Sequence, residues 1–130
     1  MPLEIGVHGE AALVVGEAET AMAFGAGGVR VLGTPVMIGL MENAAWRLVQ
    51  PELNEGETTV GTLVNVRHLA ATPVGDTVVA SAELIEIDGR RLVFRVSARD
   101  SRQLIGDGTH ERTRILLDRF LARLYGEQDG

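Results

Sequence analysis

Hydrophobic and polar residues alternate with a period of two over much of the chain, which predicts β-strands. The alternation covers five segments, residues 3–16, 58–69, 77–87, 92–99 and 103–115. Turn-forming residues separate the last four segments, and Asp88-Gly89 is a two-residue hairpin signal. We therefore predict that the first segment forms one strand, kinked at its glycines, and that the other four form an antiparallel meander.

Residues 34–49 have a different pattern, because nearly every side chain in this segment is apolar. The preceding Gly33-Thr34-Pro35 is typical of a helix start, in which the threonine suits the N-cap and the proline the first helical position. Pro51 ends the predicted helix. A helix that is apolar nearly all round is fully buried only if a curved sheet wraps it and a partner covers the rest.

The predicted order is strand, long helix, four strands and a short amphipathic helix near residues 117–124. This order predicts an α+β fold, and the length of 130 residues fits one domain over residues 1–130. A sheet of about five strands leaves exposed edges, and pairing two copies edge to edge would cover them. We therefore expect a homodimer.

Composition excludes several classes of function. The net charge of −6, without an arginine cluster, argues against a nucleic-acid partner. The absence of cysteine excludes disulfides and a thiol nucleophile. There is no signal-peptide pattern and no apolar run near the roughly 18 residues of a membrane span, so no membrane partner and a cytoplasmic location are expected. His110-Glu111-Arg112 lacks a second histidine at position 114, and no metal is expected.

Glu42 is the one charged residue in the apolar run from Thr34 to Trp46. An isolated carboxylate in apolar surroundings costs several kcal/mol unless it is paired or neutralised. His68 follows 26 residues later, on the apolar face of a predicted strand. The two residues together indicate a buried acid–base site. Structural roles are the alternative, with Glu42 bound to a backbone group or an arginine and His68 held as a core histidine.

Three blocks of sequence carry a family resemblance. They are GTPVMIGLME over residues 33–42, GTLVNVRHLAATP over residues 61–73 and GDGTHER over residues 106–112. In this order they resemble the hot-dog fold, and more narrowly the thioesterase family typified by fluoroacetyl-CoA thioesterase. The resemblance implies a homodimeric acyl-CoA thioesterase that releases a carboxylic acid and CoA without a further cofactor. It leaves the acyl group open.

The resemblance also implies which residues act. Thr34, Glu42 and His68 match the catalytic set, and Gly61 matches a glycine whose backbone lies against the substrate thioester. Such chemistry requires a base or nucleophile, a proton carrier and donors to the oxyanion, roles that fit Glu42, His68 and the hydroxyl of Thr34 or free backbone amides. The eight residues from Thr34 to Glu42 span about 12 Å of helix. Either Thr34 lies outside the helix, the substrate bridges the distance, or a partner subunit supplies one residue.

Two other functions fit a hot-dog fold. An enoyl-thioester hydratase would need an aspartate and a histidine in the loop before the helix, and residues 25–50 contain neither. A non-catalytic module that binds acyl thioesters would not need the three catalytic-type residues. The phosphates of CoA favour arginine as a ligand, and four arginines are candidates without a ranking, namely Arg67, Arg90, Arg91 and Arg112.

Overall fold

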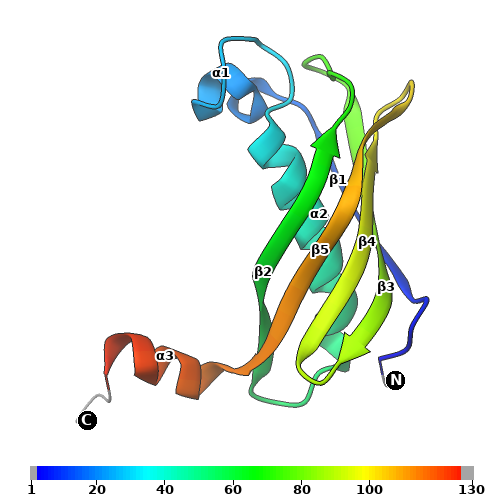
Figure 1. The fold of residues 1–130 in the computed structure, drawn as a ribbon. Coiled ribbons are helices and arrows are strands. Elements are labelled where there is room, and N and C mark those ends of the chain that lie inside the picture. The colour runs from blue at the N-terminus through cyan, green and yellow to red at the C-terminus, as the bar shows by residue number, and fades with distance from the viewer. Residues whose placement is uncertain (1–2, 127–130) are drawn as a thin grey trace.

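The structure of the protein, a computed structural model, describes residues 3–126. One five-stranded antiparallel sheet, in the order β1-β3-β4-β5-β2, curls around the long helix α2 (Figure 1). The strands are β1 (His8–Val14), β2 (Glu57–His68), β3 (Thr77–Asp88), β4 (Arg91–Arg99) and β5 (Leu104–Leu116). The helices are η1 (Glu17–Glu19), α1 (Ala21–Phe24), α2 (Thr34–Val49), η2 (Gln50–Glu52) and α3 (Leu117–Tyr125). The predicted α+β class is confirmed.

The predicted meander is wrong for β2. Strands β3, β4 and β5 pair in sequence order, but β2 pairs with β5 at the far edge of the sheet. The edge of β3 that β2 would need is occupied by β1, which pairs with it from His8 to Val14. The connection over residues 69–76 therefore leads from one edge of the sheet to its other side, and β2 keeps one free edge.

The first strand is shorter than predicted. It begins at His8, because Gly6 has a φ of 98°, in the left-handed region that interrupts a strand. Gly9 is needed for a close approach, since a Cβ there would lie 2.9 Å from Cβ of Leu48 on α2.

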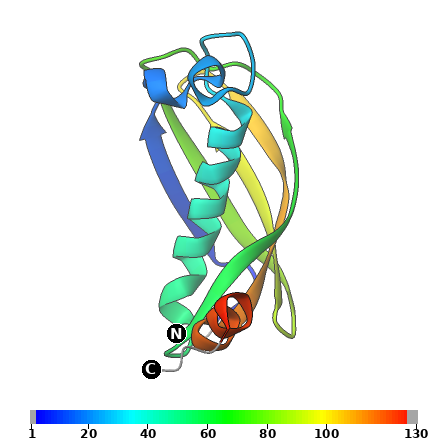
Figure 2. The same ribbon diagram turned by 90° about the vertical axis from the view of Figure 1, so that its left-hand side faces the viewer.

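Helix α2 packs one face on the concave side of the sheet, as Figure 2 shows. The buried residues of this face are Met37, Leu40, Met41, Ala44, Ala45 and Val49. Alanines at 80 and 82 on β3 are fully buried, and their small side chains let the helix lie close to the strand. The opposite face of α2 is exposed in the single chain, and Trp46 is 39% exposed. The sheet of one chain therefore covers only one face of this apolar helix, and the face with Trp46 stays uncovered.

Helix α3 extends from the end of β5 and leaves the body of the sheet (Figure 1). Its apolar residues Leu117, Leu121 and Leu124 are exposed. No helix in residues 3–126 is long and apolar enough to cross a membrane.

Candidate active site

The start of α2 and the end of β2 bring Thr34 and His68 together. Helix α2 has Gly33 as its N-cap and begins at Thr34, so the prediction of Thr34 as the cap is wrong by one residue. The threonine hydroxyl is therefore not used for capping. Its Oγ1 lies 2.7 Å from Nδ1 of His68 in a hydrogen bond. The structure thus joins two of the predicted site residues.

The second ring nitrogen of His68, Nε2, neither accepts nor donates a hydrogen bond within residues 3–126. This nitrogen is buried. Burial lowers the pKa of His68, which favours the neutral imidazole near pH 7. If Nδ1 carries the proton, Nε2 is a base, and if the hydroxyl of Thr34 donates to Nδ1, Nε2 is a proton donor. Either tautomer leaves Nε2 for a substrate or a further side chain.

A cavity of about 400 Å³ opens beside Thr34 and His68. Its other walls are small or apolar and come from residues 21, 26–29, 31–32 and 69–71. The glycine-rich segment over residues 26–28 is therefore part of this cavity wall. At Gly28 an added Cβ would meet no atom within 4 Å, so the glycine leaves space open to a ligand.

Glu42 lies about two helical turns further along α2, beside Gly61. Its side chain is 41% exposed in the single chain, so the prediction that the carboxylate is buried is wrong for one copy. A Cβ on Gly61 would lie 2.9 Å from Oε2 of Glu42, which leaves room for glycine alone unless the carboxylate moves. The strand glycine therefore lies directly beside the glutamate, a contact that the sequence did not predict.

Arg112 is the charged partner of Glu42, with Nη1 3.8 Å from Oε2. The arginine is buried, and its Nε donates to Oγ1 of Thr59 at 2.8 Å, while Nη2 donates to the Thr59 carbonyl at 3.0 Å. Its Nη1 also lies 3.2 Å from Nε2 of His110. Because a guanidinium only donates, Nε2 of His110 must accept. If Glu42 has only a structural role, Arg112 is thus the arginine that binds it. The hydrogen bonds to Thr59 and His110 hold Arg112 in place.

His110 connects this arginine to a β-bulge in β2. With Nε2 as the acceptor, Nδ1 carries the proton and donates to the Leu63 carbonyl at 2.8 Å. His110 is fully buried, and burial lowers its pKa, which keeps the ring neutral. Arg112 was considered only as a ligand for CoA phosphate and His110 only for a metal, and neither was predicted beside Glu42, although their spacing of two on a strand places them on one face.

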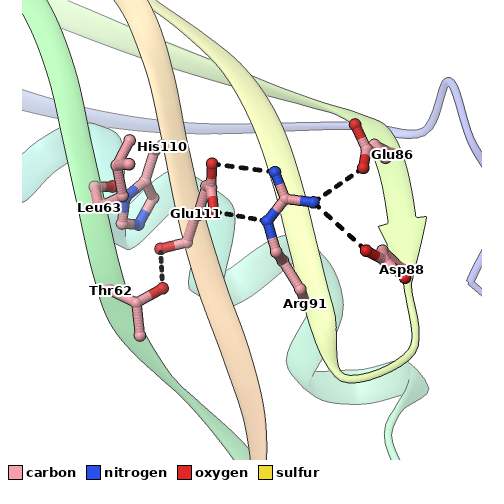
Figure 3. A network of polar contacts seen from close by, with 7 residues as sticks. All are labelled: Thr62, Leu63, Glu86, Asp88, Arg91, His110 and Glu111. Carbon is pink, nitrogen blue, oxygen red and sulfur yellow. Dashed lines mark hydrogen bonds and ion pairs between the residues drawn. The ribbon is translucent and has the colours of Figure 1, made fainter.

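The bulge is held from both faces of the sheet. Gly61 pairs with Arg112 and Leu63 with Glu111, so Thr62 is the extra residue, and its hydroxyl donates to the Glu111 carbonyl at 3.2 Å. On the outer face, Arg91 contacts Glu111 at 2.7 Å, Glu86 at 2.8 Å and Asp88 at 3.7 Å, as Figure 3 shows. These contacts fix β5 opposite the bulge, and the bulge places Gly61 against Glu42.

The predicted site residues therefore form two groups in one chain. Thr34 and His68 lie at one end of α2 and β2, and Glu42 and Gly61 lie about halfway along them. Eight helical residues separate Thr34 from Glu42, about 12 Å, and seven strand residues separate Gly61 from His68, roughly 20 Å. Within residues 3–126, no three histidine or acidic side chains gather closely enough to hold a metal ion.

A family model for the fluoroacetyl-CoA-specific thioesterases matches residues 15–117, most of the chain. The chain belongs to this family. It is 50% identical over 94 residues to a fluoroacetyl-CoA thioesterase of Streptantibioticus cattleyicolor, covering 72% of this chain and 68% of the relative. The predicted family and the prediction of a thioester hydrolase are confirmed at this level.

Solved structures with the same architecture are found within the family and beyond it. A structure of the fluoroacetyl-CoA thioesterase FlK matches with a TM-score of 0.91 and 39% identity, covering 98% of this chain and 99% of that chain. A hot-dog-like protein from Thermanaerovibrio acidaminovorans matches in fold, with a TM-score of 0.85 and 22% identity, covering 97% of this chain and 93% of that chain. The predicted hot-dog fold is confirmed.

Proposed function

We propose that this thioesterase hydrolyses an acyl-CoA at a site completed by two copies of the chain. The observation that carries the proposal is the division of the four site residues into two groups along one free sheet edge. We infer that neither group acts alone, because both ring nitrogens of the histidine nearest Glu42, His110, are already bonded, and the hydroxyl of Thr34 is the one nucleophilic group beside His68 in residues 3–126.

Pairing of β2 with its copy would unite the two groups. Residues 61–65 of this edge strand are exposed, and an antiparallel ladder with a partner would satisfy the free backbone groups of residues 62–65. In a symmetric pair centred between Val64 and Asn65, Gly61 lies opposite the partner's His68. Glu42 would then face the partner's His68 and the partner's Thr34. The same pairing would cover the exposed face of α2 that carries Trp46.

Each residue then has a defined role in hydrolysis. Glu42, paired with Arg112, removes a proton from water as the water attacks the thioester carbon, or attacks that carbon itself. Backbone amides at Gly61 and the hydroxyl of Thr34 donate to the oxyanion. The carbon–sulfur bond breaks, and His68 in its protonated form gives that proton to the departing CoA thiolate, after which it takes up a proton again from Glu42 or from solvent. Water restores the carboxylate in the second route, and both routes release a carboxylic acid and CoA.

Mixing two inactive variants tests the shared site. Glu42→Gln and His68→Ala are each expected to lose turnover, and each mixed dimer would contain one intact site. Random exchange of subunits should therefore restore about a quarter of the wild-type rate per chain. Activity that stays at the level of the separate variants, while mass measurement shows that subunits have exchanged, would place the whole site in one chain. The unmixed protein should have twice the chain mass of 13.9 kDa.

A binding module without turnover is the second candidate function. It would retain the cavity beside Thr34 and His68 but would release no CoA. A thiol-detecting dye, applied to a series of short and medium acyl-CoAs, distinguishes the two functions and identifies the acyl group. Binding of an acyl-CoA without any thiol release would contradict the hydrolase.

A further inference from the structure

The structure ranks the four arginines that the sequence offered as ligands for CoA phosphate. Arg67 lies 3.2 Å from Asp107, Arg91 lies 2.7 Å from Glu111, and Arg112 pairs with Glu42. Arg90 has no ion pair with any carboxylate in residues 3–126. A guanidinium bound by a carboxylate has fewer donors left for phosphate. Arg90 is therefore the best placed of the four.

Arg90 is part of a basic cavity at the base of α3. The cavity has a volume of about 130 Å³ and is lined by Arg90 from the β3–β4 turn, Arg119 and Arg123 from α3, and the apolar Ile115, Leu116 and Phe120. No acidic residue lines it, and neither arginine of α3 forms an ion pair with a described residue. Glu57, whose pKa Arg90 lowers at longer range, is already held by Arg114 at 2.8 Å.

Three like charges around one small cavity indicate an anion. Arg119 and Arg123 are four residues apart on α3, a spacing at which like charges repel and destabilise a helix. The repulsion also opposes the close approach of Arg90, in a chain whose net charge is −6. A phosphate group offsets this repulsion and accepts several guanidinium hydrogen bonds at once.

The cavity is within reach of the catalytic glutamate. Leu116 in its wall is four residues along β5 from Arg112, a distance of roughly 13 Å. The pantetheine arm of CoA, extended, is about as long as four or five residues of chain, roughly 15 Å. We propose that Arg90, Arg119 and Arg123 bind a phosphate of the nucleotide end of CoA while the thioester lies beside Glu42. The inference rests on the proposed acyl-CoA hydrolysis.

A comparison of two substrates tests the site. Acyl-CoA carries the phosphates, and the corresponding acyl-pantetheine lacks them. Arg119→Gln and Arg123→Gln should each lower the ratio of kcat/KM for acyl-CoA to that for acyl-pantetheine by about tenfold, through KM. Arg99→Gln is the matched control, because it removes the same charge at the opposite end of β4. A ratio that is the same in all four proteins would overturn the proposal.

Direct binding separates this proposal from the proposed function. Calorimetric titration with 3′,5′-ADP, the phosphorylated nucleoside fragment of CoA, should show binding that weakens about tenfold in Arg119→Gln. Equal affinity in the wild type and the variant would refute the arginine site. Inorganic phosphate that binds as tightly as 3′,5′-ADP would refute the assignment to CoA. A wild type that hydrolyses neither thioester refutes the hydrolase alone, since the titration still decides the arginine site.

Discussion

The two groups of site residues are built differently. Thr34 and His68 are joined by one hydrogen bond of 2.7 Å, next to an open cavity, and Nε2 of the histidine has no partner among the described residues. Glu42 instead faces a buried guanidinium, Arg112, that is held by Thr59 and by His110. The first group leaves a titratable nitrogen free, and the second fixes a charge.

This difference matches the chemistry proposed for each group. A proton carrier must exist in two protonation states, so the surroundings of His68 must tolerate both. A charged base or nucleophile works best when the dipoles and charges around it are already oriented, because no reorganisation is then needed during the reaction. The buried network behind Glu42 supplies that orientation, and the free Nε2 of His68 supplies the exchangeable proton.

The largest effect is expected from Glu42→Gln, which removes the charge but keeps the shape. We predict that kcat falls at least about a hundredfold, because neither base nor nucleophile remains. The free energy of unfolding should change by less than about 1 kcal/mol, since the pair with Arg112 spans 3.8 Å and the carboxylate is partly exposed. Stopped-time thiol release and urea unfolding measure the two quantities. A fully active variant would show that Glu42 is not a catalytic residue and only pairs with Arg112.

A smaller loss of turnover is expected from His68→Ala. A thiolate is a better leaving group than an alkoxide, so protonation contributes less here, and kcat should fall between about ten- and a hundredfold. The pH profile of kcat should also lose its ionisation below pH 7, which burial produces by lowering the pKa of His68. If His68 is only a core residue, the melting temperature falls while the rate per folded molecule and the pH profile stay as in the wild type.

Local patterns predicted the Thr34 group well. The helix start at Gly33-Thr34-Pro35 and the strand that ends near His68 are both signalled within a few residues, and both are present in the structure. The error of one residue at the cap has a physical cause. The backbone of Gly33 takes the extended conformation of an N-cap, and the hydroxyl of Thr34 is bound by His68.

The Glu42 group depends on contacts that local patterns do not contain. Pairing of β2 with β5, and not with β3, decides that Arg112 lies opposite Gly61. The bulge at Thr62 then reverses which residues of β2 face the helix, so a regular alternation over residues 58–69 assigns the residues before the bulge to the wrong face. The apolar run predicted Glu42 and the resemblance Gly61, but the register of the sheet was needed to place Arg112 and His110 beside them.

Two substitutions of His110 separate support of the bulge from support of Arg112. Asparagine retains a donor near Nδ1 for the Leu63 carbonyl but no acceptor for Arg112, and glutamine retains an acceptor near Nε2 but no donor to Leu63. We predict that His110→Asn lowers kcat about fivefold at nearly unchanged stability, and that His110→Gln keeps kcat but loses about 1–3 kcal/mol of stability. Kinetics and urea unfolding of both proteins check this. If the same variant has both the lower kcat and the lower stability, the two roles of His110 are not separate.

The smallest expected effect is a loss of stability in mild acid. Burial lowers the pKa of both His68 and His110 in the fold, whereas in the unfolded chain each titrates near 6.5. Below that pH the unfolded chain binds more protons than the folded one, so stability is complete above about pH 6.5 and declines as the pH falls toward 5. Protonation of His110 would also place a second cation against Arg112. The lowered carboxyl pKa values of Glu57, Asp100 and Glu111 contribute only at lower pH, below their ordinary range.

Urea midpoints at pH 7 and pH 5 should therefore differ in the wild type and differ less in His110→Gln. An equal difference in both proteins would show that His110 does not contribute to the acid sensitivity of the folded state.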